Sequence, residues 1–470
     1  MDLSNTIIVI VAVLLLVQPT RSAAQSPTSL PTHHREVSSY FSHEVFAARR
    51  KALAARIGNG VALVMGASTP SAYHRFRQNN TFFYLTGVEA PGAMLWINGS
   101  NGRSTLFLPE GSAMSASGPR LIPNVAAIQA TGLDNVTGME WLYLSLTSRK
   151  PDSLFVLDSP EETSATSRDG ALRSQADRFN SAWDAALPRE TAFIQQLKTR
   201  LPTVPIRDLT PIVDDMRWVK DSAEIRAMRE GGRIAVDAFA QAIRATRRGI
   251  YEHELADVTR YVFMRRGAQG EAYFPVVASG PNSVLTHYED NSRRIESNDL
   301  IVMDYAPDFQ YETLDITRTW PASGKFNAEQ VKYYNTILEA HRAIIAAVRP
   351  GVTVQDLGRI ARAVYERHGM ASRYPGGIGH FVGMSVHDQG PNDRPFVPGV
   401  VFNVEPMIGI PEKGWHFRLE DTILVTATGH EILTPGLPWE LDDLYRLRDR
   451  GSTLELQPLP AAQPSGGRSQ

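Results

Sequence analysis

The sequence predicts an α/β protein of two domains, and three observations support this class. The chain has 470 residues, 43% of them hydrophobic, which is enough apolar side chain for two separate cores. Short apolar runs alternate with helical patterns through the first half. Prolines then interrupt regular structure between Pro202 and Ser222, before a long helical pattern begins. We therefore expect an N-terminal domain over residues 40–210 and a C-terminal domain over residues 211–453.

The first 24 residues match an export signal. Residues 7–17 form an unbroken apolar run that is too short for a comfortable membrane span, and residues 22–24 are small, as at a cleavage site. The segment before the run carries Asp2 and no lysine or arginine, so an uncleaved N-terminal anchor is the alternative. Cleavage after Ala24 predicts a secreted or periplasmic protein with no membrane attachment.

Composition narrows the partners and the chemistry. A formal net charge of -2 at pH 7 gives no reason to expect nucleic acid as a partner. The chain contains no cysteine, which excludes disulfides, thiolate metal ligands and cysteine nucleophiles. Residues 25–39 are rich in serine, threonine and proline and predict a flexible tether, and residues 454–470 predict a disordered tail.

A helix-then-strand rhythm organises the N-terminal half. Residues 43–57 place apolar side chains on one helical face, and residues 61–65 follow as a short buried strand. Turns rich in glycine, proline and asparagine separate the later apolar runs. Those runs predict further strands at residues 82–85, 93–97, 105–108 and 154–157.

The C-terminal domain is expected to open on a long helix. Asp221 and Glu224 have the spacing of a capping box, and apolar residues line one face of the pattern that follows. No fixed-period repeat is visible.

Two aspartates are expected to meet across a hairpin in this domain. A short apolar strand over residues 300–303 ends at Asp304, and turn residues separate it from a second strand over residues 313–319, which contains Asp315. Pairing of the two strands would bring both carboxylates together. The alternative for either aspartate alone is a turn cap or a solvent-exposed side chain.

Three further residues are candidates for the same site. His380 lies among glycines that let the backbone pass close to a bound group, although an ordinary loop histidine is the alternative. Glu405 ends the apolar run 400–404, where a charge is unfavourable unless it is paired or bound to metal. Glu420 lies two residues after Arg418, and a surface ion pair of the two is the alternative. Four acids gathered at one point repel, so their grouping implies cations between them.

These residues and their flanks resemble the metallopeptidases of the pita-bread fold, and most nearly Xaa-Pro aminopeptidase, also called aminopeptidase P, with prolidase as a near relative. The matching features are two aspartates eleven positions apart, a Thr-Arg-Thr stretch, a glycine-flanked histidine, a Val-Glu-Pro glutamate and a last Glu-Asp glutamate. The resemblance covers residues 73–425. It implies a creatinase-like α/β N-terminal domain and a pita-bread, α+β catalytic domain. It also implies the metal ligands Asp304, Asp315, His380, Glu405 and Glu420.

The resemblance assigns two divalent metal ions to these ligands. Asp315 and Glu420 would bridge the ions, Asp304 would bind one of them, and His380 and Glu405 would bind the other. Mn²⁺ is the expected ion, and Zn²⁺, Co²⁺ and Fe²⁺ are alternatives that accept the same donors. Such a pair of ions would activate a water molecule and stabilise negative charge on the carbonyl oxygen.

The resemblance also implies four catalytic residues, namely Glu405, His387, His287 and Arg418. Glu405 would shuttle a proton from water to the leaving nitrogen, and His387 would contact the scissile carbonyl. His287 would border the proline pocket, and Arg418 is the pocket arginine. Two stretches, residues 304–306 and residues 407–409, depart from the family pattern and predict an altered pocket.

The expected function is therefore an exported, dinuclear-metal aminopeptidase that hydrolyses the N-terminal Xaa-Pro bond of peptides. Its partners would be peptide substrates with proline in second position, and the resemblance implies a homo-oligomer, a dimer or tetramer. One alternative is an Xaa-Pro dipeptidase, a prolidase, which uses the same ligands. Another is a non-enzymatic peptide-binding pita-bread module, although none of the implied ligands is missing here.

Overall fold

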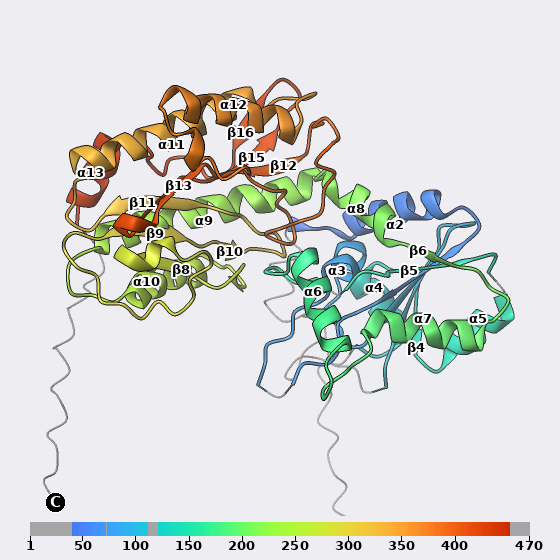
Figure 1. The fold of residues 1–470 in the computed structure, drawn as a ribbon. Helices are drawn as coiled ribbons and strands as arrows, with labels where there is room; N and C mark the ends of the chain where they lie inside the picture. Colours follow the sequence, from blue (N-terminus) through green and yellow to red (C-terminus); the bar gives the residue numbers. More distant parts are fainter. Residues whose placement is uncertain (1–39, 72, 111–120, 150, 161, 452–470) are drawn as a thin grey trace, which may run out of the picture.

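Two lobes make up the computed structural model of the protein (Figure 1). The N-terminal lobe carries the blue and teal elements and some green ones, whereas the C-terminal lobe carries a long green helix and the yellow to red elements. The expected signal peptide, tether and tail lie outside the described residues, so they stay predictions. The structure describes residues 40–451, except residues 72, 111–120, 150 and 161.

The N-terminal lobe is built on a six-stranded sheet with the strand order β4-β3-β2-β1-β5-β6. Neighbours β1 and β2, and β2 and β3, pair antiparallel, whereas β4, β5 and β6 join through parallel pairs. The bounds are β1 (Val61–Met65), β2 (Met94–Asn98), β3 (Ser104–Leu108), β4 (Asn135–Gly138), β5 (Leu154–Val156) and β6 (Ile206–Asp208).

Helices cover both faces of this sheet. Successive strand residues point to opposite faces, so β1 contributes to two cores. Ala62 and Val64 share a core with α2, α3 and α4, whereas Val61 and Leu63 share another with α5 and α7. The helices of this lobe are α2 (His43–Ile57), α3 (Asn80–Thr86), α4 (Val125–Thr131), α5 (Trp141–Arg149), α6 (Arg168–Phe179) and α7 (Arg189–Arg200).

Helix α8 (Thr210–Trp218) leads from the N-terminal lobe to α9 (Ser222–Ala245), the long helix of the C-terminal lobe. The capping box is present, because Asp221 Oδ1 accepts from the backbone N–H of Glu224 at 3.0 Å and Glu224 Oε2 accepts from that of Asp221 at 2.9 Å. The predicted start of the long helix is therefore confirmed.

In the C-terminal lobe, helices pack on both sides of several small sheets. Figure 1 shows α11 and α12 on one side of the strands and α10 on the other. The sheets are β11-β9-β8, β12-β15-β16, β13-β14 and β10-β7. The helices are α10 (Glu252–Arg265), α11 (Ala328–Ala347), α12 (Val354–Arg367) and α13 (Leu441–Asp449), with 3-10 turns at Gly280–Val284, Ala371–Arg373 and Pro411–Lys413. The strands are β7 (Gly270–Glu271), β8 (Val276–Ser279), β9 (Leu300–Asp304), β10 (Pro307–Asp308), β11 (Thr317–Pro321), β12 (Val401–Val404), β13 (Met407–Ile410), β14 (Trp415–Arg418), β15 (Asp421–Val425) and β16 (His430–Ile432).

The predicted strand over residues 82–85 is wrong, because this segment forms helix α3. The Asn79 side chain caps the helix start by accepting from the backbone N–H of Thr81 at 3.0 Å. Gly87 ends the helix in a left-handed conformation with φ 66°, and its N–H donates to Phe83. Every residue of α3 is buried, so the apolar run has no polar face to reveal a helical period.

The second strand of the aspartate hairpin is shorter than predicted. It begins at Thr317 rather than at residue 313, and Asp315 precedes it. Thr313 donates its backbone N–H to the carbonyl of Gly383 at 2.8 Å, and Asp315 donates its own to Thr422 Oγ1 at 2.9 Å. These partners replace the strand ladder, so the backbone before Thr317 leaves the sheet.

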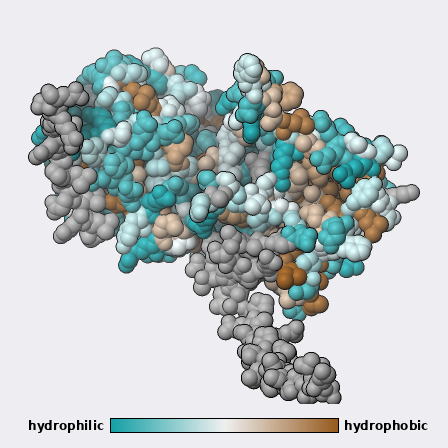
Figure 2. Space-filling view, turned by 90° about the horizontal axis from the view of Figure 1, so that it is seen from below, coloured by the Kyte–Doolittle hydropathy of each residue, from teal (hydrophilic) through white to brown (hydrophobic). Residues whose placement is uncertain are grey.

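The surface differs between the lobes. Figure 2 shows hydrophilic residues dominating the C-terminal lobe and more apolar residues over the N-terminal lobe, on the right. Exposed large apolar side chains there include Trp141, Leu144, Phe179 and Trp183. Within the described residues, no helix has the length and apolar character that crossing a membrane requires.

Candidate metal centre

Two aspartates meet at the hairpin of β9 and β11. Asp304 ends β9 and lies opposite Thr317 in the antiparallel register. The Oδ1 atoms of Asp304 and Asp315 each lie 2.6 Å from the hydroxyl oxygen of Tyr273. Both aspartates are buried. Since one hydroxyl donates one proton at a time, Tyr273 holds the carboxylates side by side without neutralising them.

His380 and Glu420 form a compact group with Asp315. One ligand atom from each of these three residues lies within 4.8 Å of the other two. His380 Nε2 is 3.3 Å from Asp315 Oδ2. The buried amide of Asn403 bridges the imidazole and the glutamate, with Nδ2 2.8 Å from His380 Nε2 and 2.5 Å from Glu420 Oε1. The structure thus brings three of the expected ligands into one cluster.

The hydrogen bonds of His380 suit a metal ligand. Its Nδ1 atom lies 3.1 Å from the carbonyl oxygen of Phe381, a contact in which Nδ1 donates. That tautomer leaves a lone pair on Nε2, toward which Asn403 Nδ2 donates. A histidine that binds metal through one ring nitrogen usually donates from the other to a carbonyl or a carboxylate.

The glycine before His380 allows this segment to run against β12. A Cβ atom at Gly379, where φ is 147°, would lie only 2.0 Å from the carbonyl oxygen of Asn403. Asn403 donates its backbone N–H to the carbonyl of His380 at 2.9 Å, and His380 donates its own to Asn403 Oδ1 at 2.5 Å. The close approach that the glycines predicted is therefore made to a strand of the same chain.

Glu420 is oriented from two sides. Thr317 Oγ1 donates to Glu420 Oε2 at 2.6 Å, and the two backbones form an antiparallel bridge. Behind the glutamate, Arg318 Nη1 donates to its carbonyl oxygen at 2.7 Å, while Arg318 Nη2 lies 3.0 Å from both carboxylate oxygens of Asp421. All four side chains are buried, so the direction of the Glu420 carboxylate is set by the fold.

Burial and mutual repulsion raise the pKa values of two of these acids well above their ordinary range. For Asp315 burial is the largest cause and the charge of Asp304 comes next, whereas for Glu420 burial is followed by the charge of Asp315. Glu405, half-buried at the end of β12, also raises both pKa values, which places its charge on the same cluster. Arg418 opposes them and donates through Nη2 to Asp304. One guanidinium cannot balance four carboxylates, so this donor set fits divalent cations.

Arg418 belongs to the interior of the site. Its side chain is 11% exposed and pairs with Asp304, so the alternative of a surface ion pair with Glu420 is wrong. Its backbone is fixed as well, because its N–H donates to Thr319 Oγ1 at 2.9 Å and the same hydroxyl lies 2.9 Å from its carbonyl oxygen. Nearby acids raise the pKa of Arg418 above its usual value against the opposing effect of burial, so the guanidinium stays charged.

Two histidines lie beside the cluster. The His387 ring stacks on the His380 ring with centroids 3.8 Å apart and an interplanar angle of 25°. Burial, followed by the charges of His380 and His287, lowers the pKa of His387 to about 3, so its imidazole is neutral near pH 7. His287 is exposed and adopts a left-handed backbone with φ 56°. The structure therefore stacks His387 on the cluster and leaves His287 at its exposed edge.

Sequence reasoning missed Tyr273, Asn403 and Thr317. A signal for Asn403 was present, because it is a polar residue inside an apolar strand and lies two positions before Glu405. Thr317 stood in the Thr-Arg-Thr stretch, but its bond to Glu420 joins segments far apart in the chain. No local pattern marked Tyr273.

The departure from the family pattern at Tyr305 lies beneath the metal centre. The side chain is fully buried, and its hydroxyl donates to Glu271. Its ring centroid is 5.0 Å from that of Phe263 and 6.5 Å from that of Tyr273. Tyr305 therefore contacts the site through Tyr273, and its ring fills the core behind the two aspartates.

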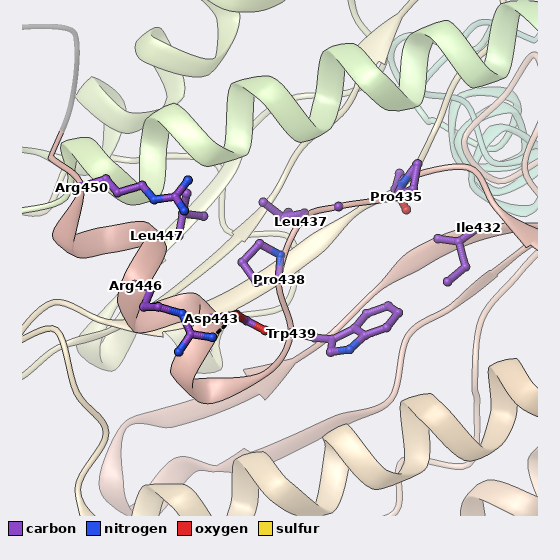
Figure 3. A pocket seen from close by; sticks show the side chains of 11 residues that line it. Ile432, Pro435, Leu437, Pro438, Trp439, Asp443, Arg446, Leu447 and Arg450 are labelled. Carbon is purple, nitrogen blue, oxygen red and sulfur yellow. Dashed lines mark hydrogen bonds and ion pairs between the residues drawn. The ribbon is translucent and has the colours of Figure 1, made fainter.

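A surface pocket of about 440 Å³ lies between α13 and the segment before it (Figure 3). Its walls include Trp439, Arg446 and Leu447 but none of the candidate site residues. The segment that lines it also accepts from Arg318, through the carbonyls of Leu437 and Pro438. The pocket thus backs onto the residues that orient Glu420, and it is separate from the cluster.

Comparisons with known proteins agree with this geometry. Residues 226–427 match the model of metallopeptidase family M24, and residues 46–165 match that of the aminopeptidase P N-terminal domain. An Xaa-Pro dipeptidase from Pyrococcus horikoshii is 33% identical over 246 residues, which cover 52% of this chain and 70% of that protein. An Xaa-Pro aminopeptidase from Haemophilus influenzae is 28% identical over 405 residues, covering 79% and 88%. The structure of a proline aminopeptidase P II from Yersinia pestis has a TM-score of 0.73 at 25% identity, covering 87% of this chain and 100% of that one.

An acid-rich cation site in the C-terminal lobe of this fold defines a metallopeptidase. The chain belongs to metallopeptidase family M24. The predicted fold class, an N-terminal α/β domain followed by a C-terminal pita-bread domain, is confirmed by the two domain matches and the structural likeness.

Proposed function

We propose that the protein is an exported aminopeptidase that hydrolyses the bond between an N-terminal residue and proline, with two divalent cations at its metal centre. The observation that carries this proposal is the cluster of Asp315, His380 and Glu420, in which two buried acids lie beside an imidazole. Relatives named Xaa-Pro aminopeptidase that align along most of the chain support the substrate class.

The proposed ligands divide between two parts of the C-terminal lobe. Asp304 and Asp315 come from the β9–β11 hairpin, whereas His380, Glu405 and Glu420 come from the segments around β12 and β15. Two divalent cations bound there, with Mn²⁺ as the proposed ions, would supply an activated water and stabilise the charge that develops on the carbonyl oxygen. The remaining chemistry belongs to side chains of this chain.

Three residues are proposed to handle protons and to position the substrate. Glu405 is half-buried and its charge acts on the cluster, so it is placed to take a proton from water and pass it to the leaving nitrogen. The neutral imidazole of His387 would donate a hydrogen bond to the scissile carbonyl. A bond before proline is a tertiary amide without an N–H, so recognition depends on a pocket for the ring, which the exposed His287 would border.

Two parts of this proposal concern the whole protein. Export is supported by the apolar run 7–17 and the small residues at 22–24, and N-terminal sequencing of the mature protein would detect cleavage after Ala24.

A homo-oligomer is supported by the exposed apolar side chains of the N-terminal lobe, such as Trp141 and Trp183. Light scattering of the purified protein would give its subunit number.

The deciding experiment is a peptide assay of the Mn²⁺-loaded protein. Xaa-Pro-Yaa, Xaa-Pro and Met-Ala-Yaa peptides are compared, with Asp315→Asn as the inactive variant. Asp443→Asn, an exposed aspartate of the pocket in Figure 3, is the matched control that should keep full activity. Cleavage of Xaa-Pro-Yaa alone that is lost in Asp315→Asn supports the proposal. Cleavage of the dipeptide alone would make the protein an Xaa-Pro dipeptidase, and activity that survives Asp315→Asn would overturn the metal mechanism.

A further inference from the structure

The histidine segment, which we define as residues 383–388, is bound by the N-terminal lobe. Asn80 Nδ2 donates to the carbonyl oxygen of Met384 at 3.2 Å and to Ser385 Oγ at 2.9 Å. Ser385 Oγ in turn donates to the carbonyl oxygen of Thr163 at 2.8 Å. Asn80 is fully buried and Ser385 is 1% exposed, so water does not compete for these bonds.

The end of the histidine segment is held by a buried ion network. Arg217 Nη2 lies 2.6 Å from one carboxylate oxygen of Asp388, and Lys220 Nζ lies 3.2 Å from the other. Arg217 Nη1 also donates to Glu162 of the N-terminal lobe at 2.7 Å. Although burial would raise the pKa of Asp388, Arg217 and Lys220 outweigh it and lower that pKa, so the carboxylate stays ionised. The cationic side chains of Arg217, in α8, and Lys220, just after it, therefore link the N-terminal lobe to the histidine segment.

These contacts fix both neighbours of His387. On one side, the backbone N–H of Val386 donates to the carbonyl oxygen of Ser164 at 2.8 Å. On the other side, Asp388 is held by its two cations. The imidazole between them stacks on His380, at 3.8 Å between ring centroids. A shift of either neighbour would move the imidazole relative to the metal centre.

We propose that the N-terminal lobe, together with the connecting helix α8, positions His387 for the reaction, with Asn80 and Arg217 as positioning residues that act through the histidine segment. The inference rests on the proposed function, because it assigns the lobe without metal ligands a role in the same hydrolysis. Neither residue needs to touch the substrate. Each holds backbone that decides where the imidazole lies.

A double-mutant cycle tests this relation. Asn80→Ala and Ser385→Ala are made in the wild-type chain and in a His387→Ala chain, and kcat and KM are measured on an Xaa-Pro-Yaa peptide. Thr131→Val is the matched control, because it removes a buried side-chain bond of the N-terminal lobe, from Thr131 Oγ1 to Ala127, far from the histidine segment in sequence. In the wild-type chain, Asn80→Ala should lower kcat about five- to tenfold, the equivalent of one hydrogen bond.

The two backgrounds separate positioning from a merely structural role. In the His387→Ala chain, Asn80→Ala and Ser385→Ala should have no further effect on kcat, since the group they position is absent. An equal loss of kcat in both backgrounds, or a similar loss in Thr131→Val, would overturn the proposal. Arg217→Met should reproduce the kcat loss, because only Lys220 then remains beside Asp388. Arg217→Lys should recover part of that loss, because it restores a second cation there.

Hydrogen exchange separates failure of this proposal from failure of the proposed function. The Val386 amide should be protected in the wild-type chain and should exchange at least about tenfold faster in Asn80→Ala, with α9 amides unchanged as the internal reference. If the wild-type chain cleaves no Xaa-Pro peptide while Val386 shows this change, the substrate assignment fails and the positioning contact stands. If Val386 exchange is the same in both chains, the positioning proposal is overturned whatever the substrate.

Discussion

Two buried charge clusters of this protein are built in opposite ways. At the metal centre, four carboxylates face one guanidinium, that of Arg418, and the pKa values of Asp315 and Glu420 rise well above normal, first through burial and then through repulsion. At the lobe boundary, Arg217 and Lys220 pair with Glu162 and Asp388, and the pKa of Asp388 falls below its normal value. The balanced cluster is complete within the protein, whereas the unbalanced one requires a ligand of positive charge.

The largest expected effect is at the unbalanced cluster. Asp315→Asn removes one of the acids that would hold cations, and it should lower kcat/KM about 1,000-fold or more. The metal-free variant should nevertheless be slightly more stable than the metal-free wild type at neutral pH, because the asparagine, unlike Asp315, is buried without having to take up a proton. Activity assays measure kcat/KM, metal analysis measures the bound cation, which should decrease, and urea unfolding of chelator-treated protein measures stability. A variant that binds metal normally would contradict the assignment of this ligand.

Breaking the balanced cluster should have the opposite result on stability. Arg217→Met leaves Glu162 and Asp388 buried without their shared partner, which should lower the free energy of unfolding by about 3 kcal/mol. Urea unfolding of metal-free protein gives this number directly. Arg233→Met, which breaks an exposed pair with Glu230, should change it by less than about 0.5 kcal/mol. Equal effects of the two substitutions would remove the distinction between buried and exposed pairs here.

The substitution Asn403→Ala tests whether the amide of Asn403 orients the metal ligands His380 and Glu420. Asn403→Ala removes the amide that lies 2.8 Å from His380 Nε2 and 2.5 Å from Glu420 Oε1. Metal affinity should fall about 10- to 100-fold, as for other residues that orient ligands. Calorimetric titration with Mn²⁺ measures the change. An unaltered affinity would mean that the amide only separates the two ligands.

The two clusters should also respond to pH with opposite signs. In metal-free protein, the folded state keeps protons on Asp315 and Glu420 that the unfolded chain releases. Their contribution to stability is therefore greatest below about pH 4 and declines as pH rises, by at most about 1.4 kcal/mol per pH unit for each group. The contribution of Asp388 is present above about pH 4 and is lost as pH falls through its lowered pKa.

Unfolding curves between pH 3 and pH 8 would show both trends. Metal-free Glu420→Gln should flatten the decline toward neutral pH, and Asp388→Asn should flatten the loss in acid. A wild-type protein whose stability is the same with and without Mn²⁺ at pH 7 would contradict the first trend.

The sequence predicted those features that depend on local patterns. Short continuous apolar runs located β1 and β9, and the capping box located the start of α9. The strand prediction for residues 82–85 failed because a fully buried helix has no polar face to reveal its period. The signals that mark this helix are the cap at Asn79 and the glycine at position 87. The spacing and flanks of the family motifs named the acids of the site, and each of these acids lies at or close to the end of a strand.

The supporting contacts of the site lie beyond such patterns. Tyr273 meets Asp315 across 42 positions of the chain, and Arg217 meets Asp388 across 171. Neither pair has a spacing that a helix or a hairpin imposes, so only the tertiary fold brings the partners together. The residues that do chemistry were therefore easier to recognise than the residues that hold them.

The bridge between Thr317 and Glu420 joins the two halves from which the proposed ligands come, one on the β9–β11 hairpin and the other around β12 and β15. Cations bound by ligands from both halves would cross-link them. Removing the cations should therefore separate the two halves as well as stop the reaction. The concentration of available metal would then control how fast proteases degrade the protein, because the metal-free chain exposes more backbone to cleavage.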